Sequence, residues 1–179
     1  MKIKFIIILI AIAVLVGFPT QTFASDVHSD PSAQLVSQNV VKTNVPDLRI
    51  KALKNIFTKY NSPLVDYADL YVKYADQNGL DWKLLPAISG LESTFGIHIP
   101  AGSYNAYGWG NGTIYFKSWE DGIKTLDEGI KTRYVDRGAT DVWTMGPMYA
   151  SSPTWAVRVD RFMNEINDEY QKITTLTNI

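Results

Sequence analysis

The 179-residue chain contains no cysteine and only two histidines. Without cysteine there is no disulfide bond, so burial of a hydrophobic core must supply the stability of the fold. His98 is the only histidine after residue 46. Because zinc sites combine several His and Cys ligands, no structural or catalytic metal site is expected, and no cofactor is expected either.

An excess of charge of one sign is also lacking. The chain has 17 basic and 18 acidic residues, and removal of residues 1–24 would take away two basic residues and no acidic one, leaving a formal charge of −3. Binding to nucleic acid is therefore not predicted, since it depends on a basic surface.

The one long apolar run is Phe5 to Phe18, which follows Lys2 and Lys4 and precedes Thr22-Phe23-Ala24. This order of basic, apolar and small residues predicts a signal peptide over residues 1–24 and an exported protein. The run is shorter than the roughly 20 residues of a membrane span, which favours cleavage after Ala24. An uncleaved membrane anchor is the alternative, so the protein is expected to be secreted or attached to the cell envelope.

Residues 25–46 are rich in Ser, Asp, Asn and Gln without a sustained period, which predicts a flexible linker. Residues 47–174 are expected to form one mainly α-helical domain, because short apolar stripes of helical period alternate with capping residues. The predicted helix boundaries are Asn61, Ser62-Pro63, Gly79, Asp81, a capping box at Ser118 and Asp121, and Ser152-Pro153.

Residues 96–116 break this pattern, with five glycines and no helical period. They predict a long functional loop, with a short hairpin at Asn111-Gly112 as an alternative. The loop carries Asn105, Tyr107 and Trp109, and aromatic rings with amide groups suit a carbohydrate ligand. The competing interpretation is that these aromatic side chains belong to the core.

Glu92 is the strongest candidate for catalysis. On a helical wheel that starts at Leu84 it falls at about 80°, between Ile88 and Leu85 on the apolar stripe, while Ser89 and Gly90 lie outside that stripe. A carboxyl group in apolar surroundings is costly to ionise and is a candidate general acid. The alternative is a glutamate at the edge of the stripe that reaches water or pairs with an arginine.

Four segments together resemble the lysozyme-like cell-wall glycosidases over about residues 62 to 170: LLPAISGLESTFG, NAYGWG, FKSWEDGI and YASSPTWAVRVDRFMNEI. The pair Glu92-Ser93 resembles lytic transglycosylases. NAYGW, SWEDGI and YASSPTWA are similar to glucosaminidase domains. The resemblance implies a lysozyme-like helical domain in which the glycine- and aromatic-rich loop lines the active site.

The resemblance also implies an activity, cleavage of β-1,4 bonds between N-acetylglucosamine and N-acetylmuramic acid in the glycan strands of peptidoglycan. Glu92 would protonate the leaving oxygen, and Tyr149, which matches a tyrosine of the glucosaminidase motif, is expected as a second catalytic residue. The residues then expected to bind the substrate are Ser93, Asn105, Tyr107, Trp109 and Trp155.

A second catalytic carboxylate is not evident, because Glu120 and Asp121 are explained as residues at the start of a helix. The GLMQ block of transglycosylases and the acidic hairpin residue of many glucosaminidases are also missing. Glu92 is therefore expected to act as both acid and base, as in transglycosylase chemistry, where a 1,6-anhydro product forms without an activated water. The main alternative is a non-catalytic module that binds the cell wall.

Overall fold

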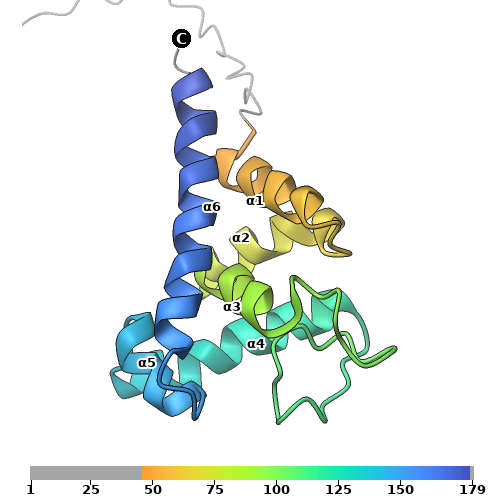
Figure 1. Ribbon diagram of the computed structural model, residues 1–179, viewed down its shortest axis with the longest axis vertical. Coiled ribbons are helices and arrows are strands. Elements are labelled where there is room, and N and C mark those ends of the chain that lie inside the picture. The colour runs from red at the N-terminus through yellow and green to blue at the C-terminus, as the bar shows by residue number, and fades with distance from the viewer. Residues whose placement is uncertain (1–45, 178–179) are drawn as a thin grey trace, which may run out of the picture. The chain divides into compact units, whose positions relative to one another are not determined.

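The computed structural model describes residues 46–177, which belong to one compact unit (Figure 1). The predicted signal peptide and all of the predicted linker except Pro46 lie outside the described residues. The elements in chain order are α1 (Leu48–Lys59), η1 (Val65–Tyr67), α2 (Ala68–Asn78), α3 (Leu84–Ser93), α4 (Trp119–Arg133), η2 (Val135–Arg137), α5 (Val142–Tyr149) and α6 (Trp155–Thr177). Within this part of the chain, no helix combines the length and the apolar character that crossing a membrane requires.

The mainly α-helical class is confirmed, and residues 46–177 contain no β-strand. The alternative of a hairpin at Asn111-Gly112 is wrong. The backbone there forms successive turns, in which the amide of Gly112 donates to the carbonyl of Gly108 at 3.0 Å and that of Thr113 to Gly110 at 3.1 Å. These local bonds use groups that a paired strand would need for its ladder.

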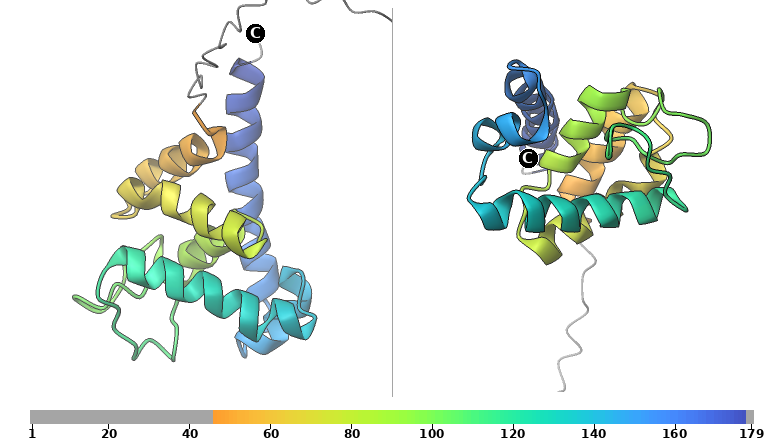
Figure 2. Two further views of the ribbon diagram at one scale, coloured as in Figure 1. Left: turned by 180° about the vertical axis from the view of Figure 1, so that it is seen from behind. Right: turned by 90° about the horizontal axis from the view of Figure 1, so that it is seen from below.

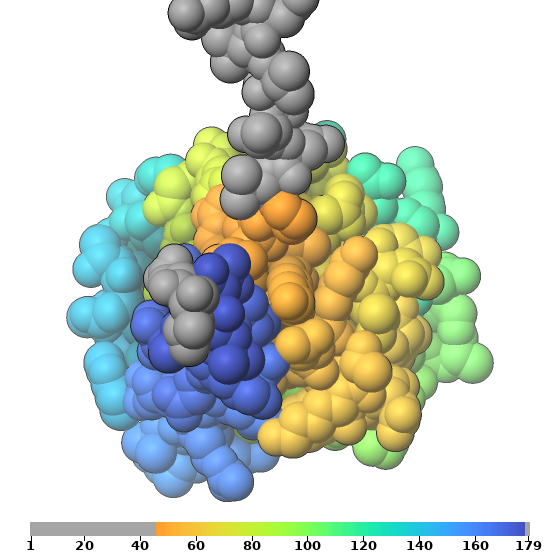
Figure 3. All heavy atoms as spheres, turned by 90° about the horizontal axis from the view of Figure 1, so that it is seen from above, coloured from red at the N-terminus to blue at the C-terminus, as the bar shows by residue number. Residues whose placement is uncertain are grey.

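Helix α6 is the longest element, and α1, α3 and α5 all pack against it (Figure 1). Helix α4 packs on α2 and on α3, and the view from below shows the loop that precedes α4 projecting to one side (Figure 2). Seen from above, α1 and the C-terminal part of α6 form adjoining parts of the surface (Figure 3).

Helix α3 lies at the centre of the fold and is buried on nearly all sides. Its residues 84–90 are all buried, including Ser89 and Gly90. A Cβ added to Gly90 would lie 2.7 Å from Phe95 and 3.0 Å from Phe162, so glycine lets α3 approach α6 closely. Ser89 and Gly90, which lie outside the predicted apolar stripe, are therefore buried too, because small residues allow a tight contact on that side of the helix.

The predicted helix boundaries are confirmed in part. Gly79 ends α2 in the left-handed conformation, and the Ser118 side chain accepts a hydrogen bond from the amide of Asp121 at the start of α4. The predicted start of the second helix at Ser62-Pro63 is wrong, since a turn and η1 precede α2 there.

Helix α5 has no counterpart in the sequence prediction. Asp141 and Thr144 form a capping box at its start, a signal that was overlooked because Gly146 and Pro147 interrupt the helical pattern.

Asp127, on α4, is a carboxyl group that the fold buries. Its side chain accepts a hydrogen bond from the Asn78 amide on α2 at 2.7 Å, and only 1% of the residue is exposed. Burial raises the pKa of Asp127 to about 6.

We expect Asp127→Asn to flatten the dependence of stability on pH. Because the folded state holds the proton more tightly than the unfolded state, the contribution of Asp127 is fully present below about pH 4 and is lost as the pH rises through about 6. Asparagine still accepts from Asn78, so the variant is expected to gain up to about 3 kcal/mol at pH 7. Urea unfolding from pH 4 to 7 measures this, with the exposed Asp168→Asn as control. An unchanged pH slope in Asp127→Asn would contradict the assignment.

Candidate functional site

Glu92 lies in the last turn of α3, where the central helix reaches the surface. The residue is exposed, so the expectation that its carboxyl is embedded among apolar side chains is wrong. Leu85 and Ile88 are buried as predicted, but Glu92 comes one turn after Ile88, where the packed part of the helix ends. A helical wheel shows only the angle of each residue about the helix axis, so it does not show where along the axis the packed part of the helix ends.

The carboxylate of Glu92 is nevertheless held in a defined position. The indole Nε1 of Trp155 donates a hydrogen bond to Oε1 at 3.0 Å. A Cβ added to Gly108 would lie 3.3 Å from Oε2, so the loop backbone approaches the second oxygen closely. Among residues 46–177, Glu92 forms no ion pair, neither with Arg133 nor with Arg158. The carboxylate thus has one neutral donor and remains open to a ligand.

The chain turns sharply just after Glu92. Thr94 and Phe95 have φ angles of 52° and 55°, a left-handed conformation that is uncommon for a residue other than glycine and strained for a β-branched threonine. The amide of Phe95 donates to the carbonyl of Ser89, and the buried Phe95 ring anchors the turn in the core. Strain of this kind persists only where surrounding contacts impose it, and here it fixes how the loop leaves Glu92.

Ser93 fastens this loop to α3. Its hydroxyl donates to the carbonyl of Ala106 at 2.8 Å and accepts from the amide of Gly96 at 2.8 Å. Ser93 is 4% exposed, and its hydroxyl also lies 3.1 Å from the carbonyl oxygen of Ser89. The predicted contact of Ser93 with a substrate stays a prediction, whereas its present contacts position the loop.

Asn105 organises the loop from inside. Its Nδ2 donates to the carbonyls of Trp109 and Ile114 at 2.9 and 3.0 Å, and its Oδ1 accepts from the amide of Trp109 at 3.1 Å. The residue is 3% exposed. In this structure Asn105 therefore shapes the loop, and it is not presented at the surface.

Tyr107 is buried below the loop and joins it to α2. Its hydroxyl lies 2.8 Å from that of Tyr71, and burial raises the pKa of both phenols. The backbone carbonyl of Tyr107 accepts a hydrogen bond from the Tyr149 hydroxyl at 3.0 Å. Tyr107 thus belongs to the core, as the competing sequence interpretation held.

The pair of buried hydroxyls predicts a strong coupling between Tyr71 and Tyr107. Replacing either tyrosine by phenylalanine leaves one buried hydroxyl without its partner, and we expect this to lower the free energy of unfolding by about 1–3 kcal/mol. Replacing both tyrosines removes the two polar groups together, so the loss is expected to be smaller than the sum of the two single losses. Chemical unfolding of both single variants and the double variant measures the coupling, with the exposed Tyr115→Phe as control. Additive single effects would contradict this expectation.

Tyr149 and Trp155 form an aromatic wall beside Glu92. Their rings stack at a centroid distance of 4.6 Å, and Trp109 and Tyr134 extend the wall at 6.1 and 5.6 Å from Tyr149. The guanidinium of Arg133 lies 5.1 Å from the Trp109 ring centre, within the range of a cation–π contact. The fold therefore brings together Glu92, Tyr149, Trp155 and Trp109 from α3, α5, α6 and the loop.

Burial is the main cause that raises the pKa of the Tyr149 phenol, and the nearby charge of Glu92 raises it further. Tyr149 therefore stays protonated at neutral pH. A neutral phenol can donate a hydrogen bond or a proton but is not a base, and the predicted catalytic role of Tyr149 stays a prediction.

The three acids on α4 whose hydrogen-bond partners are defined all have partners away from this wall. Glu120 accepts from the Tyr74 hydroxyl, Asp121 accepts from the amide of Lys117, and Asp127 is paired with Asn78. None of these three supplies a second carboxylate in contact with Glu92.

One member of the site, Gly108, was missed from the sequence. Gly108 has a φ angle of 64° and faces Glu92, and the glycine of NAYGWG is a signal that was available. Arg133 is one of the two arginines that the sequence offers as an ion-pair partner of Glu92, and it lies against the Trp109 ring instead.

A scan of the chain against protein-family models finds no matching family, and a search of curated proteins finds no significant match. The functional assignment therefore rests on the segments of sequence described above and on the geometry of the site.

Proposed function

We propose that this chain is an exported, lysozyme-like glycosidase that cleaves β-1,4 bonds between N-acetylglucosamine and N-acetylmuramic acid in peptidoglycan, with Glu92 as the general acid. The observation that carries the proposal is the setting of Glu92. It is exposed, it has no ion-pair partner among residues 46–177, and it is aligned by the Trp155 indole and the Gly108 backbone. An exposed glutamate needs no ion-pair partner, so the feature that distinguishes Glu92 is the hydrogen bond that it accepts from the buried Trp155 indole.

The aromatic wall supports a sugar polymer as the ligand. Rings of Tyr and Trp offer flat apolar faces to the C–H groups of a pyranose. Trp155 is 2% and Trp109 9% exposed, so these two rings form the buried base of the wall, and Tyr134 and Tyr149 are its partly exposed members. A bound glycan would therefore lie along the surface beside Glu92, with the loop as one wall.

In the proposed reaction, protonated Glu92 donates its proton to the glycosidic oxygen as the bond to the anomeric carbon breaks. The indole N–H of Trp155 donates to Oε1 and leaves Oε2 for the proton transfer. Trp155 is a positioning residue in this scheme.

The ionised Glu92 left after the first step is the base available for the second. In transglycosylase chemistry it takes the proton from the C6 hydroxyl of the muramyl residue as that oxygen attacks the anomeric carbon, which closes a 1,6-anhydro ring. Hydrolysis instead requires a group that activates water. Glu120, Asp121 and Asp127 of α4 have hydrogen-bond partners elsewhere, and this favours the scheme with one carboxylate.

Mass spectrometry of products from purified sacculi tests the proposal and separates the chemistries. Anhydromuramyl ends identify a transglycosylase, reducing N-acetylglucosamine ends a glucosaminidase, and reducing muramic acid ends a muramidase. Sacculi that are bound but never solubilised would overturn the enzymatic proposal and favour a non-catalytic module that binds the cell wall.

A further inference from the structure

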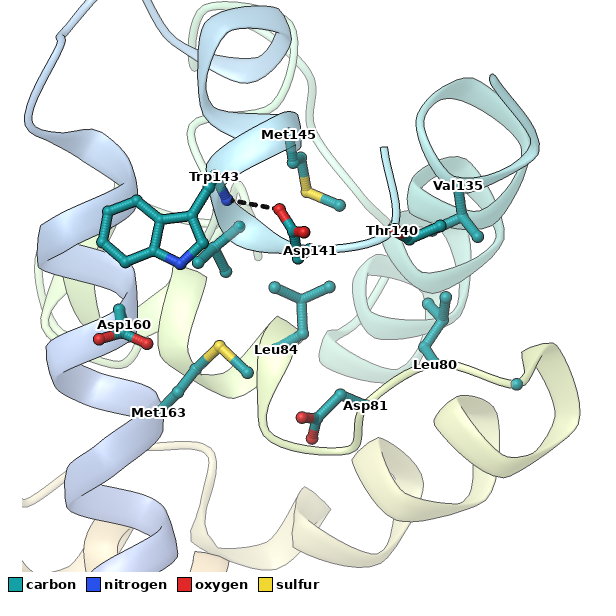
Figure 4. Close-up of a pocket in the computed structure, with 12 residues that line it drawn as sticks. Leu80, Asp81, Leu84, Val135, Thr140, Asp141, Trp143, Met145, Asp160 and Met163 are labelled. Atoms are coloured by element: carbon teal, nitrogen blue, oxygen red, sulfur yellow. Dashed lines mark hydrogen bonds between the residues drawn. The ribbon is translucent and has the colours of Figure 1, made fainter. Parts of the chain in front are cut away.

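A pocket of about 380 Å³ lies between the α2–α3 connection, the start of α5 and the middle of α6 (Figure 4). None of its lining residues belongs to the aromatic wall, and none is hydrogen-bonded to Glu92. The volume is at the lower end of the range for small-ligand sites. The pocket is thus a second candidate site, and its assignment does not depend on the proposed glycosidase function.

The interior of the pocket is apolar. Leu84, Met145 and Met163 line it, from α3, α5 and α6 respectively, and Figure 4 shows their side chains directed toward a common space. An apolar lining of this kind favours an aliphatic ligand, because burying hydrocarbon releases water from both surfaces.

The rim of the pocket is acidic. Asp81, Asp141 and Asp160 lie around it, and none of the lining residues is Lys, Arg or His. Lys83 pairs with Asp81 at 2.9 Å and offsets one of these charges. Asp160 accepts a hydrogen bond from the Asn164 amide at 3.0 Å. Asp141 caps α5, and hydrogen bonds from the Thr144 backbone and side chain lower its pKa, so it stays ionised.

Trp143 adds an aromatic face beside the pocket. It is 54% exposed, an unusual degree for tryptophan, and Figure 4 shows its indole extended above Asp160 and Met163. An aromatic ring next to carboxylates and an apolar interior is the combination that binds a cation with a hydrocarbon body. A neutral or anionic ligand would not balance the charges of Asp141 and Asp160, whose hydrogen-bond donors are neutral groups.

We propose that this pocket binds an aliphatic chain ending in an ammonium group, with the hydrocarbon between Leu84, Met145 and Met163 and the ammonium between Trp143 and the carboxylates of Asp141 and Asp160. The ligand is either a free alkylamine or a lysine-type side chain carried by a peptide. The two sources share this chemistry and are separated by the experiment below.

Methyl NMR of the full chain labelled with ¹³C-methyl methionine tests the proposal, because Met145 and Met163 line the pocket and the exposed Met148 does not. Pentylamine is expected to shift the signals of Met145 and Met163 saturably and to leave Met148 unchanged. The affinities of pentanol and pentanoate are expected to be at least about tenfold lower than that of pentylamine. Equal binding of pentanol, equal shifts at Met148, or no saturable shift would overturn the proposal.

The double variant Asp141→Asn with Asp160→Asn is expected to lose about tenfold in pentylamine affinity. Asparagine also caps helices well, so α5 keeps its start. Asp168→Asn, elsewhere on α6, is the matched control. Undiminished affinity of the double variant would overturn the assignment. Nα-acetyl-lysine amide separates the sources: binding comparable to pentylamine identifies a peptide side chain, whereas binding of pentylamine alone identifies a free amine.

Discussion

Glu92→Gln is expected to abolish release of soluble muropeptides from purified sacculi, with a fall in rate of at least about 100-fold. Glutamine has nearly the shape of glutamate but carries no proton that it can transfer to a glycosidic oxygen. The folded state should be little affected. Glu92 is exposed, and the amide oxygen of glutamine still accepts the Trp155 indole hydrogen bond, so the change in stability is expected to stay within about 0.5 kcal/mol.

The measurement pairs muropeptide release with thermal unfolding of the same preparations. Glu128→Gln on α4 is the matched control, because Glu128 is exposed and its contact with Lys124 is a weak one at 4.0 Å. It should keep full activity and stability. Full activity of Glu92→Gln would sink the assignment of the general acid, and a large loss of stability would point to a structural role.

The second large effect is expected for Asn105→Ala, and it concerns stability. Alanine removes the side chain that binds the Trp109 and Ile114 carbonyls and the Trp109 amide, and it leaves these backbone groups without their partner in a mostly buried setting. Each such group costs about 1–3 kcal/mol. A total loss of about 3 kcal/mol or more is therefore expected, together with increased amide exchange across residues 103–116.

Urea unfolding and hydrogen exchange measure this effect. Asn55→Ala is the control, since Asn55 is exposed on α1 and makes one hydrogen bond, to Glu169. Its change is expected to stay within about 0.5 kcal/mol. If Asn105→Ala keeps the stability of the native chain but weakens binding to sacculi, Asn105 contacts the substrate directly and the role inferred from its burial is wrong.

Asn105 also shows why site residues were only partly predictable from the sequence. An asparagine among tyrosines and tryptophans is typical of a sugar-binding surface, and it is equally typical of a loop held together by an amide side chain. The two roles differ in whether the side chain points outward or inward. That direction is set by the turn conformations of residues 104–112, several with positive φ, which depend on packing against α3 and α4. One such contact is at Gly122, where a Cβ would lie 2.8 Å from the Tyr104 carbonyl oxygen.

Glu92 shows a second limit of prediction from the sequence, which concerns burial. The periodicity of Leu84, Leu85 and Ile88 correctly predicted a helix with a buried stripe. The same periodicity placed Glu92 inside that stripe, because a helical wheel has no information on where along its axis a helix leaves the core. The exposure of Glu92 depends on the turn at Thr94 and Phe95 and on the position of α6.

The sequence by itself determined the helical class, the face of α6 that carries Trp155 and Val159, the glycine that ends α2 and the existence of a long loop before α4. These features follow from local propensities and from periodicity along one segment. Only the tertiary structure decided that Trp155 donates to Glu92, that Tyr149 stacks on Trp155 and that an acidic pocket opens between α2, α5 and α6. Such contacts join residues tens of positions apart, and their geometry depends on how whole helices pack, which no short segment specifies.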